Sequence, residues 1–296
     1  MLFRSKKWIF DHSKIHLVAA SQWTYRIIQD SPILSDLPCT VIPFGLNTRI
    51  FYPHDKQTSR QKLGIPANNH VIMFRCMAGT PYKGLRYIKE ALAELDNTRH
   101  NITLLTVGST GLIPELTSKY QIIEMGTVYE PEKMADVLSA ADIFLMPSIA
   151  ESFGMMAVEA MACGVIPLVF EGTALPDITH APHCGIAVPS KDSKALLEAI
   201  YHLLNDPADY SKRSAYALEL VKSEYNTEAY IRRHMNLYYS LSSQCWQPAE
   251  FECAISLLNL VCNQDQQPLK QNPHIDPIWW RALRKIKRLL FPQKVK

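Results

Sequence analysis

The sequence lacks several patterns that would assign a chain to a protein class directly. No run of about 18 uncharged apolar residues occurs, so no transmembrane helix is predicted. The first eight residues contain no apolar core long enough for a secretory signal. The 7 cysteines are scattered without a C-x-x-C pair, which excludes a zinc knuckle and a disulfide framework. Buried, reduced thiols in a cytoplasmic protein are the expectation.

Common catalytic signatures are missing as well. The sequence contains neither H-E-x-x-H nor the G-x-S-x-G of a hydrolase elbow. The turn Val107-Gly-Ser-Thr-Gly111 follows a predicted strand, but it matches neither G-x-G-x-x-G nor a P-loop. A metalloprotease, a serine hydrolase and a P-loop nucleotidase therefore have no local support.

Positive charge is unevenly distributed. The formal net charge of +3 comes from 31 Lys+Arg and 28 Asp+Glu, and residues 277–296 hold seven of the bases and no acid. Residues 1–276 therefore carry a net charge of −4. A nucleic-acid binder would normally spread its basic footprint over the folded domain, so no nucleic-acid partner is expected.

Short apolar segments alternate with amphipathic segments along most of the chain. The strands lack the apolar-polar alternation of a half-exposed sheet, so both faces of the sheet are expected to be covered. This pattern predicts an α/β fold with a doubly wound parallel sheet over residues 46–230, and helices in 231–296. The predicted strands are 15–20, 40–42, 71–75, 102–107, 122–124, 142–146, 165–170 and 186–188; the predicted helices are 21–29, 85–95, 131–140, 154–163, 191–205, 207–223 and 226–241.

One candidate site lies where the strand 142–146 gives way to a helix. Glu151 stands in the connecting loop, and Gly154 allows a ligand to approach the backbone closely. The free N–H groups and the dipole at a helix start favour an anion. Glu159 follows on an otherwise apolar helix, where an ionised carboxylate is costly unless it is paired or faces a ligand. The alternative is one acidic first-turn residue and one solvent-facing Glu.

A second candidate site follows the strand 71–75. Gly79 and Gly84 shape this loop, and Arg75 and Lys83 place positive charge near the next helix. Two cations at a helix start suit a diphosphate, where they would oppose developing negative charge. The alternative is a solvated loop with ordinary surface cations.

The string P-S-x-x-E-S-F-G-x-x-x-x-E-A-M-A-C-G-x-x-P, with Glu151 and Glu159 at its two acidic positions, resembles the E-x7-E motif of family 4 glycosyltransferases. Further matches are Val41–Asn47, the Lys83-Gly84 loop and Glu124-Met-Gly126. The resemblance covers about residues 8–240. It implies the C-terminal, Rossmann-like half of a GT-B fold and transfer of a sugar from a nucleoside diphosphate sugar, with retention and without an essential metal or other cofactor.

The resemblance also implies a role for each matched position. Glu151 would contact sugar hydroxyls, Lys83 would neutralise the diphosphate, and Glu159 would accept hydrogen bonds from the ribose. The family has an Arg shortly before the Lys, and Arg75 is the nearest candidate here. The remaining donor-binding positions are the amides of Phe153, Gly154 and Met155, the turn Gly126, Thr127 and Val128 near the base, and Gly79.

Members of the family also have an N-terminal acceptor domain of similar size. Residues 1–45 resemble only the last strand and helix of that domain, with the linker. The expected function is therefore a glycosyltransferase of polysaccharide or glycolipid assembly that is incomplete as a single chain. A truncated reading frame, a mis-assigned start and a split enzyme with a complementary N-terminal domain chain are the three explanations for the missing domain. The alternative is a catalytically silent nucleotide-sugar-binding module or subunit of a split enzyme.

The C-terminal tail forms a separate prediction. Residues 278–291 fit a helix with an apolar stripe that includes Trp279, and with Arg and Lys over its other side. This combination suits an anionic membrane surface, as expected for an enzyme at the cytoplasmic face that uses a lipid-linked or glycan acceptor. Docking on an acidic partner, on the protein's own surface or on nucleic acid are the alternatives.

Overall fold

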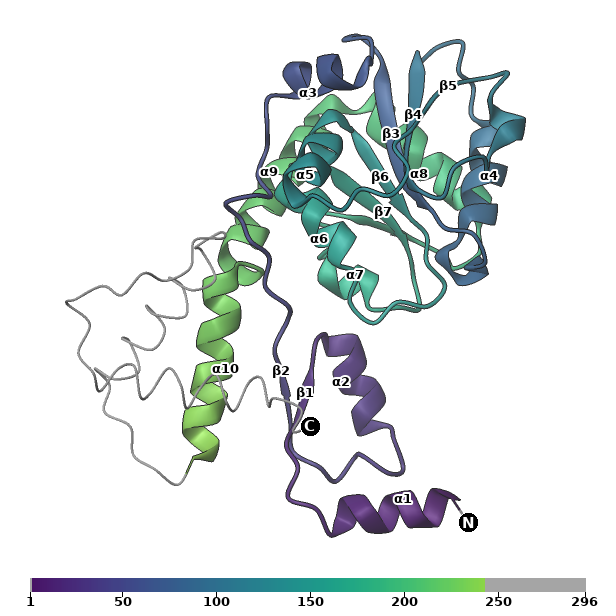
Figure 1. Ribbon diagram of the computed structural model, residues 1–296. Helices are drawn as coiled ribbons and strands as arrows, with labels where there is room; N and C mark the ends of the chain where they lie inside the picture. The colour runs from purple at the N-terminus through teal and green to yellow at the C-terminus, as the bar shows by residue number, and fades with distance from the viewer. Residues whose placement is uncertain (1, 243–296) are drawn as a thin grey trace, which may run out of the picture. The chain divides into compact units, whose positions relative to one another are not determined.

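A parallel sheet of six strands forms the centre of the computed structural model, which describes residues 2–242 (Figure 1). Every neighbouring pair of strands is parallel, in the order β5-β4-β3-β6-β7-β8. The predicted doubly wound α/β class is confirmed. The strands are β3 (His70–Cys76), β4 (Ile102–Gly108), β5 (Gln121–Glu124), β6 (Ile143–Met146), β7 (Ile166–Phe170) and β8 (Ile186–Val188).

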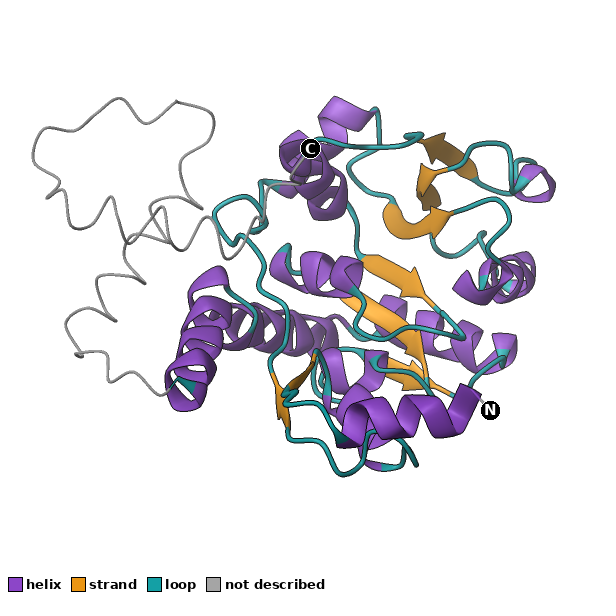
Figure 2. Cartoon of the chain, turned by 60° about the horizontal axis from the view of Figure 1, so that its bottom comes forward, coloured by secondary structure: helices purple, strands orange, loops and turns teal. Residues whose placement is uncertain are grey.

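Helices cover both faces of this sheet (Figure 2). Alternate residues of β3 point to opposite sides, so Val71 and Met73 belong to one apolar core and Ile72 and Phe74 to the other. Both faces of the sheet are therefore shielded from solvent, which explains why the strand sequences are continuous apolar runs. One core is closed by α4 (Leu85–Glu94) and α8 (Ser193–Asn205), the other by α5 (Pro131–Ala140), α6 (Met155–Ala162) and α9 (Pro207–Glu224).

The order of the strands creates a crevice at one edge of the sheet. The chain runs from β3 outward through β4 to β5, and then returns to place β6 on the other side of β3. Strand order reverses between β3 and β6, and loops that leave adjacent strands in opposite directions open a ligand site at their carboxyl ends. Arg75 is the next-to-last residue of β3, and Met146 ends β6.

Several helices of the structure were not predicted from the apolar periodicity. Helix α3 (Lys56–Leu63) contains one apolar residue, but Asp55 caps its start, and Gly64 ends it with φ of 68°. Its Arg60 is buried and donates to the Asp142 carboxylate at 2.7 Å, so a charge pair helps to anchor this helix. The other missed elements are α1 (Leu2–Asp11), α7 (Leu175–Ile178) and the 3-10 turns η1 (Pro81–Lys83) and η2 (Pro114–Leu116).

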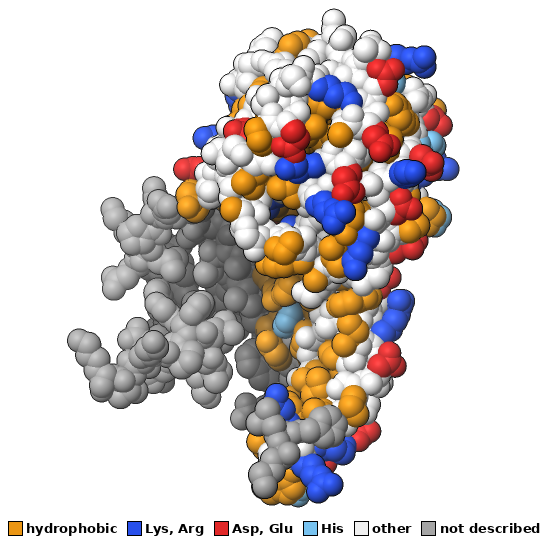
Figure 3. All heavy atoms as spheres, turned by 90° about the vertical axis from the view of Figure 1, so that its right-hand side faces the viewer, with side chains coloured by type: hydrophobic (Ala, Val, Ile, Leu, Met, Phe, Trp, Pro, Cys, Tyr) orange, Lys and Arg blue, Asp and Glu red, His pale blue; other side chains and the backbone are white. Residues whose placement is uncertain are grey.

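The N-terminal segment builds a second, smaller sheet. Strands β1 (Leu17–Ala19) and β2 (Cys39–Val41) pair in parallel, and α2 (Gln22–Gln29) lies between them in sequence. Ser21 caps α2 as predicted. Hydrophobic side chains gather over the lower part of the face in Figure 3, where Figure 1 places this segment. Trp8 and Val18 of this segment are exposed.

Both predicted domain limits lie close together in space. The Leu46 N–H donates to the Tyr225 carbonyl at 2.6 Å, and the Thr227 N–H donates to the Leu46 carbonyl at 3.1 Å. Helix α10 (Thr227–Leu241) follows, and the predicted tail helix 278–291 lies outside the described residues. The division at residues 45 and 230 stays a prediction.

Three of the four cysteines in the described part, Cys76, Cys163 and Cys184, are buried free thiols.

Candidate functional site

Two loops at the crevice are tied to each other through their backbones. The Ile149 N–H, after β6, donates to the Tyr82 carbonyl, after β3, at 2.8 Å. Gly84 has φ of 78°, and a Cβ placed on it would lie far inside contact distance of the Pro147 carbonyl oxygen. Only glycine fits this contact, so the two loops form one rigid wall of the site.

An ion pair joins the same two loops. The Lys83 Nζ lies 2.6 Å from the Glu151 Oε2, and the two side chains are 27% and 16% exposed. The sequence predicted that both residues would lie at the carboxyl edge of the sheet, and the structure brings them together. It did not predict that they would contact each other.

Gly154 makes the turn into α6. Its φ is 98°, and a Cβ there would overlap the Leu175 side chain. Phe153 is buried against Phe44, with ring centroids 4.9 Å apart in an edge-to-face arrangement. The first amides of α6, beginning at Met155, therefore open toward the crevice at the positive end of the helix.

The first of two adjoining cavities, which we call the Lys83 pocket, has a volume of about 300 Å³. It combines a cation, a carboxylate and a helix start, which can hold an anion beside a hydroxyl-rich group. Its lining includes Phe44, Arg75, Lys83, Ser148, Glu151, Ser152, Phe153, Gly154, Met155 and Met156.

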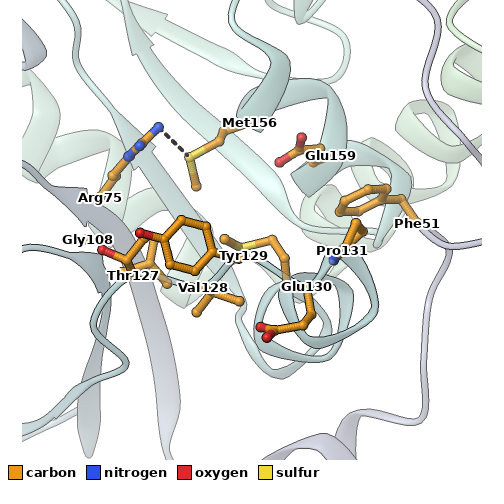
Figure 4. A pocket seen from close by; sticks show the side chains of 12 residues that line it. Phe51, Arg75, Gly108, Thr127, Val128, Tyr129, Glu130, Pro131, Met156 and Glu159 are labelled. Atoms are coloured by element: carbon orange, nitrogen blue, oxygen red, sulfur yellow. Dashed lines mark hydrogen bonds between the residues drawn. The ribbon is translucent and has the colours of Figure 1, made fainter.

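The second cavity, the Glu159 pocket, has a volume of about 310 Å³ and is shown in Figure 4. Arg75 and Met156 line both cavities, so the two pockets form one extended site. Each is at the lower end of the size range of ligand pockets. The Glu159 pocket is lined by Phe51, Arg75, Val107, Gly108, Thr127, Val128, Tyr129, Glu130, Pro131, Met134, Met156 and Glu159.

Glu159 points into the second pocket from the second turn of α6 (Figure 4). Burial raises the pKa of this carboxyl group to about 7, against an opposing effect of the Arg75 charge. The Arg75 guanidinium donates toward the Met156 Sδ at 3.9 Å, as the dashed line in Figure 4 shows. A half-buried carboxylate over a cavity can accept hydrogen bonds from ligand hydroxyls.

Aromatic residues in the second pocket were not predicted as site residues. Phe51 is buried, whereas Tyr129 is 84% exposed although it lines the cavity. Figure 4 shows the Tyr129 ring extending along the cavity beside Thr127 and Val128, which were predicted. The position of Tyr129, directly after the predicted base-proximal turn, is the signal in the sequence that could have identified it.

Two predicted glycines lie outside the walls of the cavities. Gly79 and Gly126 are not among the described residues that line either pocket, although each has positive φ in a loop at this edge. The Gly126 carbonyl accepts from the Gly108 N–H at 2.7 Å, so it supports the turn rather than facing the cavity.

The described part of the chain has neither a metal-binding cluster nor a membrane-spanning helix. Residues 2–242 contain no cluster of three or more His, Cys, Asp or Glu side chains arranged to hold a metal ion. No helix within the same range is both long and apolar enough to cross a membrane.

The sequence profile of the glycosyl transferases group 1 matches residues 55–219. A D-inositol 3-phosphate glycosyltransferase of Segniliparus rotundus is 31% identical over 160 residues, which are 51% of this chain and 35% of that protein. A GDP-mannose-dependent monoacylated alpha-(1-6)-phosphatidylinositol monomannoside mannosyltransferase of Corynebacterium glutamicum is 29% identical over 213 residues, or 67% and 55% of the two chains.

The fold is also found among solved structures. Alr3699/HepE of Anabaena, solved in complex with UDP and glucose, superimposes with a TM-score of 0.65 at 20% identity. The superposition covers 82% of this chain and 67% of that chain. The chain spans about a third of the length of the Segniliparus rotundus relative and about half the length of the Corynebacterium glutamicum relative.

Proposed function

Because the chain belongs to the glycosyl transferases group 1, we propose that it binds the nucleoside diphosphate sugar donor of a retaining glycosyltransferase. The observation that carries this proposal is the continuous pair of pockets at the carboxyl ends of β3, β4 and β6. One pocket offers a cation and a helix start, and the other offers a carboxylate between aromatic walls. A diphosphate flanked by a sugar and a nucleoside has this distribution of chemistry.

The Lys83 pocket is proposed to hold the sugar and the diphosphate. Lys83 and Arg75 would neutralise the phosphates, together with the amides of Phe153, Gly154 and Met155 at the start of α6. Glu151 would accept hydrogen bonds from sugar hydroxyls. When the glycosidic bond to the diphosphate breaks, negative charge grows on the leaving oxygen, and fixed positive charge at that place lowers the barrier.

The Glu159 pocket is proposed to hold the nucleoside. The Glu159 carboxylate would accept from the ribose hydroxyls, and the turn from Gly126 to Val128 would lie near the base. Tyr129 supplies an exposed aromatic face on which a base can stack. Gly79 is assigned to shaping the phosphate loop and not to contacting the ligand.

Isothermal titration tests donor binding. UDP-glucose and GDP-mannose are the first probes, because a related structure contains UDP and a relative is named for GDP-mannose. At least one is expected to bind, equally with EDTA and with Mg²⁺, since no essential metal is proposed. Glu159→Ala should weaken binding by about a hundredfold, given the strength of hydrogen bonds to charged groups. The exposed Glu132→Ala serves as the matched control. The proposal would be rejected if neither UDP-glucose nor GDP-mannose, nor any other nucleotide sugar, binds to the chain.

Transfer itself is proposed for the whole enzyme to which this chain corresponds, since catalysis needs both reactants held together. The acceptor class proposed is a glycan or lipid-linked glycan of the cell envelope, at the cytoplasmic membrane face. The exposed apolar residues of the N-terminal segment support contact with a complementary domain, because a two-stranded sheet is marginal alone. NMR can monitor transfer of the sugar to an added acceptor. Transfer with retention of configuration would support the enzyme, whereas binding of the donor without transfer would favour the silent module.

A further inference from the structure

We propose that Glu151 makes the site distinguish a nucleotide sugar from a bare nucleoside diphosphate, by competing with the diphosphate for Lys83. The inference rests on the proposed function and concerns how the two ligands differ at one place in the site. Its basis is the 2.6 Å ion pair between the Lys83 ammonium group and the Glu151 carboxylate.

The ion pair is a built part of the site. Both side chains are more than two thirds buried, and their loops are joined by the Ile149–Tyr82 backbone hydrogen bond and by the close contact between Gly84 and Pro147. Because the loops are fixed to each other, Glu151 cannot move far from Lys83 without disturbing the wall. The backbone therefore fixes the loop of Glu151, whereas the ammonium group lies at the end of the longer Lys83 side chain and is held to the carboxylate by charge.

Arg75 is the second cation that lines this pocket among the described residues. Its guanidinium donates toward Met156 Sδ, and its charge acts on Glu159 in the adjoining pocket. Lys83 is thus the cation within hydrogen-bonding distance of Glu151. If a phosphate draws Lys83 away, Glu151 remains as a carboxylate that is 16% exposed and has lost its partner. An unpaired carboxylate at this depth carries a penalty that opposes binding.

The nucleotide sugar and the bare nucleoside diphosphate differ in whether they can compensate for this penalty. The sugar of the donor has hydroxyl groups that donate to Glu151, so the carboxylate exchanges one partner for others. A bare diphosphate has only acceptors at that end and leaves the carboxylate unsatisfied. Glu151 therefore weakens the binding of the diphosphate that remains after transfer, while it retains the donor. Release of the spent nucleotide follows from the same geometry that holds the sugar.

The test is a titration of four proteins with UDP, UDP-glucose, GDP and GDP-mannose: the unaltered chain, Glu151→Gln, Lys83→Gln and the double variant. Gln keeps the size of the side chain and removes its charge. Glu151→Gln is expected to bind the bare diphosphate about tenfold more tightly, since the ion pair no longer competes. Affinity for the matching nucleotide sugar should change less, because release of Lys83 and loss of the charged acceptor oppose each other.

The double variant separates competition from simple repulsion. If Glu151 acts by holding Lys83, its replacement has no effect on diphosphate affinity once Lys83 is Gln. A gain that persists in the Lys83→Gln background would show general charge repulsion and overturn the proposal. Unchanged or weaker diphosphate binding by Glu151→Gln would overturn it as well. Glu132→Gln controls for the loss of one negative charge from the protein, and is expected to change neither affinity.

Folding and function are checked separately. Circular dichroism and thermal unfolding establish that each variant is folded, and Glu151→Asp replaces Glu151→Gln if the latter is not. The shorter carboxylate cannot reach Lys83 at 2.6 Å from the same backbone, so it should also favour the bare diphosphate. If the unaltered chain binds none of the four probes or other nucleotide sugars, the proposed function has failed. If it binds them without the predicted change, only the role of Glu151 has failed.

Discussion

The two pockets share one edge of one sheet but are built in opposite ways. The Lys83 pocket is tied by a backbone hydrogen bond, a glycine that excludes any side chain, and an ion pair. The Glu159 pocket adjoins a turn in which a Cβ on Gly126 would meet nothing within 4 Å, and its lining includes the Tyr129 ring, which is 84% exposed. Charge is paired in the first pocket, whereas in the second a half-buried carboxyl group has no comparable ion pair among the described residues.

This difference indicates where each part of the binding free energy originates. In the Lys83 pocket, hereafter the tied pocket, the side chains are already fixed by their contacts within the protein. Binding therefore exchanges these existing partners for those of the ligand. In the Glu159 pocket, hereafter the open pocket, a ligand would itself cover the exposed Tyr129 ring. Substitutions in the tied pocket should therefore disturb both the fold and the ligand, whereas removal of the exposed ring from the open pocket should affect mainly the ligand.

The largest effect is expected from breaking the tie between the two loops. Gly84→Ala forces a Cβ into the Pro147 carbonyl and places alanine at φ of 78°. The free energy of unfolding should fall by about 3 kcal/mol or more, because backbone must move and the residue is strained. Urea denaturation measures the change, and titration should show weaker donor binding as well.

Gly79→Ala is the matched control for that variant. Gly79 lies in the same loop with φ of 70°, but a Cβ there meets nothing within 4 Å. The cost should be confined to the left-handed conformation, about 1 kcal/mol. Equal losses from the two substitutions would mean that the contact with Pro147 does not hold the wall together.

The next effect concerns the carboxyl group of the open pocket. Burial raises the pKa of Glu159 to about 7 in the folded chain, above its ordinary value near 4.5. The folded state therefore binds the proton more tightly, and this contribution to stability is lost as the pH rises from about 4.5 to 7. Glu159→Gln should be more stable than the unaltered chain at pH 8 by about 3 kcal/mol, and nearly equal at pH 4.5. Urea denaturation at both pH values measures this.

The same group should make donor affinity depend on pH. Since the ionised carboxylate is the acceptor for ribose, affinity for UDP-glucose or GDP-mannose should rise from pH 6 to pH 8 and then level off. A nucleotide sugar is the suitable probe, because its diphosphate does not titrate in this range. An equally steep rise in Glu159→Gln would assign the titration to another group.

The exposed ring of the open pocket gives a smaller effect. Tyr129→Ala should weaken nucleotide binding about tenfold by removing the stacking surface, while thermal stability changes little because the ring is 84% exposed. Tyr129→Phe keeps the surface and should bind like the unaltered chain. If the two variants bind equally well, the base does not use this ring.

The tied pocket was the easier one to predict from the sequence, for a physical reason. Its residues follow apolar strands, so Lys83 and Glu151 could be placed at one sheet edge from the periodicity alone. The predicted strand 71–75 is observed as β3, and the predicted helix 85–95 as α4. The contact between the two side chains depends on loop conformation, which spacing does not determine.

The open pocket and the polar helices could not be predicted in this way. Tyr129 directly follows the turn predicted to lie near the base, but whether its ring lines the cavity depends on tertiary contacts that set the direction of the loop. Helix α3 has no apolar stripe. Its position is fixed by the hydrogen bond from Arg60 to Asp142, which lies 82 residues away in the sequence. The capping residues Asp55 and Gly64 are the local signals for that helix in the sequence.

The smallest expected effect tests whether the N-terminal segment supports the tied pocket. Ser21 is buried; its Oγ accepts from the Thr24 N–H at 3.1 Å and donates to the Ser152 carbonyl at 3.1 Å, next to Glu151. Ser21→Ala removes a helix cap and this bond, so the free energy of unfolding should fall by about 1 kcal/mol. Ser21→Thr keeps the hydroxyl and is the control. Because the lost bond supports the loop of Glu151, nucleotide-sugar affinity should fall about twofold to threefold in Ser21→Ala, with bare diphosphate affinity unchanged. A loss of stability with both affinities unchanged would confine Ser21 to capping α2, and the tied pocket would then owe its rigidity to the sheet domain alone.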